Sequence, residues 1–239
     1  MSSPERISPK RTDSELEQRQ ALITGFAPRI APLDASELNA EALTLLAGLI
    51  AVNSAFEPRN PQGAEDLIAA HAAGTAALGG EAPEAALPPL IRTMLRHPGL
   101  FARQVDISSE LLGRGTLSAR DRELLVLRVA WLCQAPFEWG EHVHIGKTAG
   151  ITAEEIERIT LDSNAPGWSE HDRALLRAVD ELRADAMISD ATWRTLEQRY
   201  DERQLIELVI VIGQYQTIAY YQNSLRVSLH EGNLGLKAR

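Results

Sequence analysis

A short stretch near the middle of the chain brings together side chains that can move protons. Pro136 suits the first turn of a helix, where its missing N–H is not needed. In a helix from Pro136 to Ala149, Glu138 and His142 lie one turn apart on one face, and Trp139 flanks that face. The start of such a helix favours an ionised Glu138 or a bound anion. The pattern predicts an acid–base site, although a solvated Glu–His pair on the surface has the same spacing.

Other chemistry for these residues is less well supported. His142 and His144 are two residues apart and therefore point in different directions from one helix, which is poor geometry for a shared metal. A mononuclear site made by Glu138, His142 and a third residue is the remaining metal alternative. Cys133 is the single cysteine and follows an apolar run, so we interpret it as a small core residue. We expect no metal and no cofactor.

The elements that must position these residues are predicted to be helices. Side chains that suit helix starts recur along the chain, and the capping pairs are Asp34 with Glu37, Ser118 with Asp121, Thr152 with Glu155, Ser169 with Asp172, and Asp201 with Gln204. The apolar residues between these starts mostly follow helical spacing. Leu208–Ile212 is β-branched enough for a strand, but its length together with the following segment favours a buried helix. The sequence predicts an all-α protein of about ten helices.

A weak internal repeat supports this interpretation. The segment Glu123–His142 aligns without gaps on Gln204–Asn223, and each is predicted to carry an apolar helix, a polar break and a second helix. The alignment predicts two pseudo-repeated helical-hairpin units packed on each other. The ionisable groups occur in the first copy only.

Composition and charge limit the partners and the location of the protein. The net charge of -9 and the absence of a basic cluster argue against nucleic acid. No apolar run reaches the roughly 20 residues that span a bilayer, so no membrane is expected. The polar start without a signal segment and the single cysteine favour the cytoplasm. We expect a flexible arm over residues 1–20 and a single domain over residues 21–239.

The run LSARDRELLVLRVAWLCQAPFEWGEHVHIGKTAGITAEEIERI, residues 117–159, resembles the core motif of the carboxymuconolactone decarboxylase and alkylhydroperoxidase D superfamily. PLIRTMLRHPGLF, DRALLRAVDELRADAMISDATW and GQYQTIAYYQNSL resemble longer members. The resemblance covers most of the chain beyond Gln20, and Asn53–Gly80 is the least similar part. It implies the all-α alkylhydroperoxidase D-like helical bundle and a homo-oligomer, a trimer or a multiple of one.

The resemblance also separates two branches of the superfamily. The peroxidase branch uses a glutamate, a CxxC pair and a histidine, and in register these fall on Glu123, on Ala135 with Glu138, and on His142. Because peroxide reduction by that route needs an attacking and a resolving thiol, the chain is not a CxxC peroxidase. The decarboxylase branch instead has a glutamate four residues before the histidine, which Glu138 and His142 provide.

The decarboxylase branch implies a cofactor-independent lyase or isomerase that acts on a small carboxylated lactone or aromatic-derived acid. By this resemblance His142 is the general acid, assisted by Glu138 and Glu123. Hydrolysis of a lactone by the same residues and a non-catalytic oligomeric scaffold are the alternatives.

Further residues are expected to bind the small-molecule substrate, and these are Trp139, Arg128 and Tyr215. Arg128 is one of three arginines around Glu123, with Arg120 and Arg122, that can meet a substrate carboxylate or instead form an ion pair. Tyr215 belongs to a group of tyrosines, with Tyr220 and Tyr221, that can line the site or pack in the core.

Overall fold

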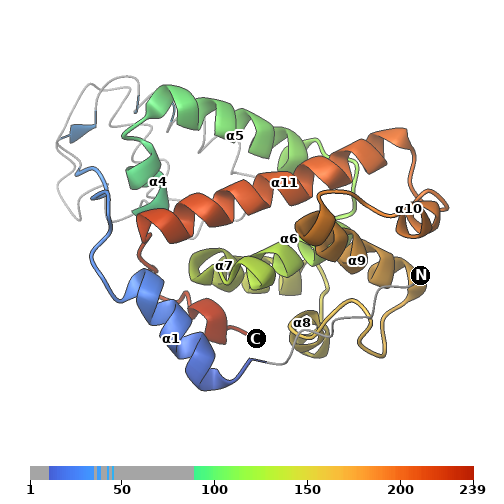
Figure 1. Ribbon diagram of the computed structural model, residues 1–239. Helices are drawn as coiled ribbons and strands as arrows, with labels where there is room; N and C mark the ends of the chain where they lie inside the picture. Colours follow the sequence, from blue (N-terminus) through green and yellow to red (C-terminus); the bar gives the residue numbers. More distant parts are fainter. Residues whose placement is uncertain (1–10, 35–36, 39–41, 43–44, 46–88) are drawn as a thin grey trace. The chain divides into compact units, whose positions relative to one another are not determined.

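The computed structural model describes residues 11–34, 37–38, 42, 45 and 89–239 (Figure 1). In this part the chain forms α-helices and one short 3-10 helix, and no strand. The elements are α1 Asp13–Thr24, α4 Pro89–Met94, α5 Pro98–Gly113, α6 Ala119–Cys133, α7 Pro136–Thr148, α8 Ala153–Ile159, α9 Glu170–Asp185, α10 Asp190–Leu196, α11 Glu202–Leu225 and η3 Gly235–Lys237. The all-α prediction is confirmed. Asn53–Gly80 lies outside the described residues.

The chain divides into two compact units. Ala27–Gly115 forms the smaller unit, whose described helices are α4 and α5, and its apolar core contains Leu33, Leu95 and Phe101. Residues 1–26 and 116–239 form the larger unit, which contains every residue predicted for the site. The single domain expected over residues 21–239 stays a prediction, because a compact unit is not by itself an independently folding domain.

The predicted arm over residues 1–20 is wrong for its second half. Helix α1 begins at Asp13, and Thr12 and Glu15 form a capping box at its start. Leu16 and Ile23 are buried on one side of this mostly polar helix, and α1 packs against η3 near the end of the chain. The tertiary contact stabilises a segment whose own sequence has little to bury.

Helix α6 is the centre of the larger unit. It packs against α7, α9 and α11 (Figure 1), and all its residues from Asp121 to Trp131 are buried. A helix that is buried on every side is unusual unless its polar residues are paired inside the protein. Charged residues of α6 such as Glu123 and Arg128 are paired with neighbours from other segments, and the partner of Glu123 is His142, which belongs to the predicted site.

Helix α11 runs without interruption from Glu202 to Leu225, so the predicted second helical hairpin is wrong. In the first copy, Gln134 adopts a left-handed conformation with φ 47° and Pro136 starts a new helix, so the chain turns. The second copy has no proline at this place, and the lone Gly213 weakens a helix only by about 1 kcal/mol. The capping pairs at α6, α8, α9 and α11 are confirmed, as is the helical state of Leu208–Ile212.

Residues near the end of the chain form hydrogen bonds with α7. The Asn233 side chain donates to the Phe137 carbonyl oxygen at 3.0 Å and to Glu141 at 2.8 Å, and it accepts from the Gly235 amide at 2.8 Å. This packing requires Gly140, because a Cβ atom there would lie 1.8 Å from the Asn233 Oδ1 atom. The helix that carries Glu138 and His142 is thus held by sequence about 90 residues away.

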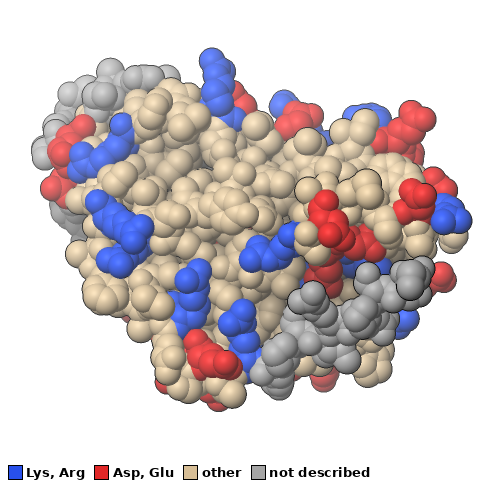
Figure 2. Space-filling view, in the orientation of Figure 1, with Lys and Arg blue, Asp and Glu red and all other residues tan. Residues whose placement is uncertain are grey.

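Acidic and basic side chains are interspersed on the face of the molecule shown in Figure 2, without an extended patch of either sign. No helix in the described part of the chain has the length and apolar character needed to cross a membrane. The expected absence of nucleic acid as a partner stays a prediction.

Candidate functional site

The turn between α6 and α7 brings the two halves of the candidate site together. Because Gln134 and Ala135 are the whole connection, α7 folds back along α6 and the two helices pack closely. Glu123, in the second turn of α6, and His142, in the second turn of α7, are 19 residues apart in sequence. The distance between His142 Nδ1 and Glu123 Oε2 is 2.7 Å. Two of the three predicted catalytic residues therefore make a direct hydrogen bond.

This bond engages one of the two nitrogens of the His142 ring. Glu123 is fully buried, and an ionised carboxylate there accepts a hydrogen bond from the Nδ1–H of the imidazole. The Tyr215 ring lies edge-on to the imidazole with 5.0 Å between the ring centroids. Among the described residues the His142 Nε2 atom has no hydrogen-bond partner, and the side chain is 12% exposed. The Nε2 atom is therefore the imidazole nitrogen that remains free for a further hydrogen bond.

Glu138 is a buried carboxyl without a partner. Its residue is 1% exposed, and in the described part of the chain neither carboxyl oxygen forms a hydrogen bond. Burial raises the pKa of Glu138 well above its ordinary value of 4.5, and the nearby charge of Glu123 raises it further. The sequence predicts the opposite, an ionised Glu138 favoured by the helix start. The helix dipole contributes only about 1 kcal/mol, so desolvation outweighs it and the neutral acid is favoured.

Two tyrosines of α11 complete the cluster. Burial raises the pKa of Tyr215 well above 10, with the charges of Glu123 and Glu138 adding to the effect. Burial and the nearby Glu138 also raise the pKa of Tyr221. Both phenols therefore keep their protons at neutral pH and can donate hydrogen bonds. The third tyrosine, Tyr220, is 56% exposed and lies outside this cluster.

Two residues predicted to bind substrate are engaged elsewhere. The Trp139 side chain is fully buried. Its ring packs at a tilt of 53° against Trp131, with 4.8 Å between the ring centroids, and its N–H donates to the Ala238 carbonyl oxygen at 3.0 Å. Arg128 donates to Asp180 at 2.7 Å and to the Ile159 carbonyl oxygen at 2.6 Å. The structure does not bring either polar group to His142.

The surroundings of Cys133 disfavour thiol chemistry. Cys133 is buried, its sulfur accepts a hydrogen bond from Arg183 at 3.2 Å, and burial raises the pKa of the thiol. A raised pKa disfavours the thiolate that a nucleophile requires. Within the described ranges, no group of three or more His, Cys, Asp or Glu side chains is placed to hold a metal ion.

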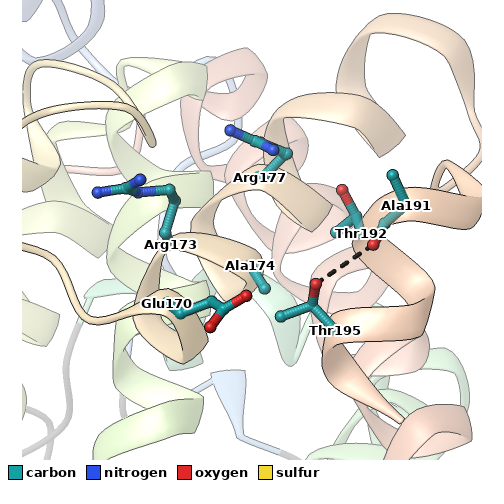
Figure 3. A pocket seen from close by; sticks show the side chains of 7 residues that line it. All are labelled: Glu170, Arg173, Ala174, Arg177, Ala191, Thr192 and Thr195. Atoms are coloured by element: carbon teal, nitrogen blue, oxygen red, sulfur yellow. Dashed lines mark hydrogen bonds between the residues drawn. The ribbon is translucent and has the colours of Figure 1, made fainter. Parts of the chain in front are cut away.

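A pocket of about 170 Å³ lies between α9 and α10 (Figure 3). Glu170, Arg173 and Arg177 line it from α9, and Thr195 lies on the α10 side, where its hydroxyl donates to the Ala191 carbonyl oxygen at 3.3 Å. None of the residues predicted for the site lines this pocket. The buried cluster around His142 is the better candidate site, because perturbed titratable groups converge there.

Residues 98–181 match the model of the carboxymuconolactone decarboxylase family. This region includes Glu123, Glu138 and His142. Among proteins with curated functional descriptions, none matches this chain.

Solved structures with a similar fold include the following three. A protein of unknown function from Agrobacterium tumefaciens, proposed to be the antioxidant defence protein AhpD, is 20% identical with a TM-score of 0.53, over 57% of this chain and 94% of its own. An uncharacterised peroxidase-related protein from Silicibacter is 14% identical with a TM-score of 0.57, over 73% and 88% of the two chains. Another from Ralstonia eutropha, with an alkylhydroperoxidase AhpD core, is 14% identical with a TM-score of 0.56, over 72% and 90%. At these identities the similarity shows the fold alone.

Proposed function

Since this chain belongs to the carboxymuconolactone decarboxylase and AhpD-like superfamily, we propose that it is a cofactor-independent lyase or isomerase. The substrate is a small carboxylated lactone or aromatic-derived acid. The observation that carries the proposal is the Glu123–His142 hydrogen bond, which leaves His142 Nε2 without a partner in a cluster that also contains the buried Glu138. The family match supports the substrate class, and the geometry supports proton transfer.

In the decarboxylation the bond between the lactone ring carbon and its carboxylate breaks. CO2 leaves, and the electron pair enters the conjugated lactone carbonyl to give an enolate. A proton must then return to carbon. His142 Nε2 exchanges this proton with the substrate, while the Glu123 carboxylate holds the ring and stabilises the imidazolium form. Glu138, as a buried neutral acid, is a second proton donor.

The enolate oxygen needs hydrogen-bond donors, and the Tyr215 and Tyr221 phenols supply them. Both are protonated at neutral pH, because the ordinary tyrosine pKa of 10 already lies well above it and burial raises the pKa of each phenol further. Donors held in place before the reaction stabilise a developing oxyanion without reorganisation. An isomerase reaction uses the same steps, except that a proton rather than CO2 leaves the carbon.

The names of the similar solved proteins point to peroxide chemistry, which this sequence does not support. Its single cysteine cannot form an intrachain disulfide, so the dithiol cycle cannot run within the chain. The position that matches the second cysteine of the CxxC pair holds Glu138, a carboxyl that carries a proton instead of a thiol that carries electrons.

The test is CO2 release and product analysis on a panel of carboxylated lactones, without added metal or cofactor. His142→Ala is expected to lower kcat/KM by roughly 100-fold or more, because general acid–base catalysis contributes about that much. The matched control is His144→Ala, since His144 is exposed on the same helix and should leave turnover unchanged.

Each product pattern has a distinct meaning. CO2 release that depends on His142 supports the lyase, and an isomerised acid without CO2 supports the isomerase. Ring opening without CO2 identifies a lactone hydrolase that uses the same residues. A panel without turnover at high enzyme concentration rejects the proposal and favours a scaffold. Assembly into a trimer or a multiple of it, expected from the resemblance, is measured separately by light scattering.

A further inference from the structure

Arg122 is a buried cation whose hydrogen-bonding capacity is largely unused. The residue is 9% exposed, and its Nε atom lies 3.4 Å from Glu123 Oε1, which is long for a charge-assisted hydrogen bond. Among the described residues neither of its terminal guanidinium nitrogens has a hydrogen-bond partner. A guanidinium carries five N–H donors, so the terminal nitrogens of Arg122 can still bind an acceptor at the exposed edge of this side chain.

The other two arginines of α6 differ in this respect. Arg120 forms ion pairs with Glu155 and Asp172, and Arg128 forms one with Asp180. Both are therefore explained by contacts inside the protein. Of the three arginines on this helix, only Arg122 has both terminal guanidinium nitrogens without a hydrogen-bond partner among the described residues.

The position of Arg122 relates it to the proposed chemistry. Glu123 Oε1 contacts the Arg122 guanidinium, and Glu123 Oε2 contacts the His142 imidazole. The Glu123 carboxylate thus lies between the Arg122 guanidinium and the His142 imidazole. Both side chains keep a small exposed edge, 11% for Arg122 and 12% for His142, while the carboxylate between them is fully buried.

We propose that Arg122 anchors a carboxylate of the substrate beside His142. This inference rests on the proposed function, since it names the residue that recognises the acid. A planar guanidinium matches a carboxylate with two parallel hydrogen bonds, which fixes the orientation of the substrate as well as its position.

The anchored carboxylate is the one that the substrate retains. A guanidinium that held the departing carboxylate would stabilise the charge that decarboxylation removes and would slow the reaction. A decarboxylation substrate therefore carries a second carboxylate, whereas an isomerisation substrate needs only one. The role is that of a positioning residue that fixes the reacting carbon near His142 Nε2.

Binding of benzoate and of its neutral analogue benzamide, measured by isothermal titration calorimetry, tests the anchor without turnover. The wild type should bind benzoate more tightly than benzamide. Arg122→Gln should weaken benzoate binding by about tenfold to a hundredfold, as expected for hydrogen bonds to a charged group, and should leave benzamide binding unchanged. Arg203→Gln removes the same charge from an exposed position on α11 and is the matched control.

Several results would overturn the anchor: no benzoate binding to the wild type, equal binding of benzoate and benzamide, or wild-type affinity in folded Arg122→Gln. If that variant does not fold, the Nε–H signal of Arg122 in the wild-type NMR spectrum decides, assigned by its absence from Arg122→Lys. It should shift on addition of benzoate and not of benzamide, and an unmoved signal rejects the anchor.

The binding result is independent of the activity result. Selective benzoate binding with an inactive lactone panel would keep the anchor and reject the reaction. Turnover with wild-type KM in Arg122→Gln would keep the reaction and reject the anchor. Where both hold, Arg122→Gln should raise KM more than it lowers kcat, and Arg122→Lys should restore part of the loss.

Discussion

Replacing Glu138 with glutamine tests whether this carboxyl is neutral in the folded protein. An unfolded chain releases the Glu138 proton near the ordinary pKa of 4.5, whereas the folded protein retains it to higher pH because the side chain is buried. Between those two pKa values the unfolded state binds fewer protons than the folded state. The contribution of Glu138 to the free energy of unfolding of the wild type must therefore fall as pH rises through this window.

The magnitude follows from the exchange of one proton. Each pH unit in the window lowers the contribution of Glu138 to stability by up to about 1.4 kcal/mol. Below pH 4.5 both states hold the proton and the contribution is constant. Glu138→Gln has no proton to release, so its stability relative to the wild type should increase with pH at this slope. A constant offset from changed packing does not affect the slope.

The assay is urea unfolding of both proteins at half-unit steps from pH 4 to 8. Glu154→Gln, a change at an exposed carboxyl on α8, is the control and should give a difference that does not depend on pH. A flat difference between wild type and Glu138→Gln from pH 5 to 7 would refute the neutral carboxyl. A difference that decreases with pH would show instead that Glu138 is ionised and stabilised by a partner.

Three further changes test other parts of the structure. Gly140→Ala should lower the free energy of unfolding by about 1–3 kcal/mol in urea, because the new methyl group displaces Asn233 from α7, and an unchanged midpoint would contradict this packing. The pKa of Asp121 falls from 3.8 to about 2 through its histidine and tyrosine partners, after a burial effect in the opposite direction, so Asp121→Asn should cost about 2 kcal/mol at pH 7. That cost should disappear as pH falls from 4 towards 2, and a loss that persists at pH 2 would contradict the assignment. Glu123→Gln should reduce kcat on an active substrate by at least about tenfold, because the amide no longer stabilises the protonated His142 ring, and unchanged kcat would remove this carboxylate from the chemistry.

The sequence predicted the features that depend on local interactions. A Ser, Thr or Asp side chain that caps a helix bonds to a backbone amide three residues away, so the starts of α6, α8, α9 and α11 could be located. The pairing of Glu123 with His142 came from the spacing of a family motif. The structure supplies its physical basis in a two-residue turn that folds α7 back along α6.

The tertiary structure alone decided which charged side chains form ion pairs. Arg122 and Arg128 lie on the same helix, and neither position reveals its partners: Arg128, between Leu127 and Val129, meets Asp180, which lies 52 residues further along the chain. The protonation of Glu138 likewise depends on how completely other segments bury it, which the position at a helix start does not reveal. The second half of the predicted arm became α1 because it packs against η3, more than 200 residues away.

Local spacing and capping thus determined the helix starts, and a family motif indicated the candidate proton-transfer residues. The charge state of these candidates, and the free hydrogen-bonding capacity of Arg122, depend on desolvation and on partners distant in sequence. Desolvation and pairing both depend on which atoms surround a side chain in space. These surroundings are established only when the helices pack.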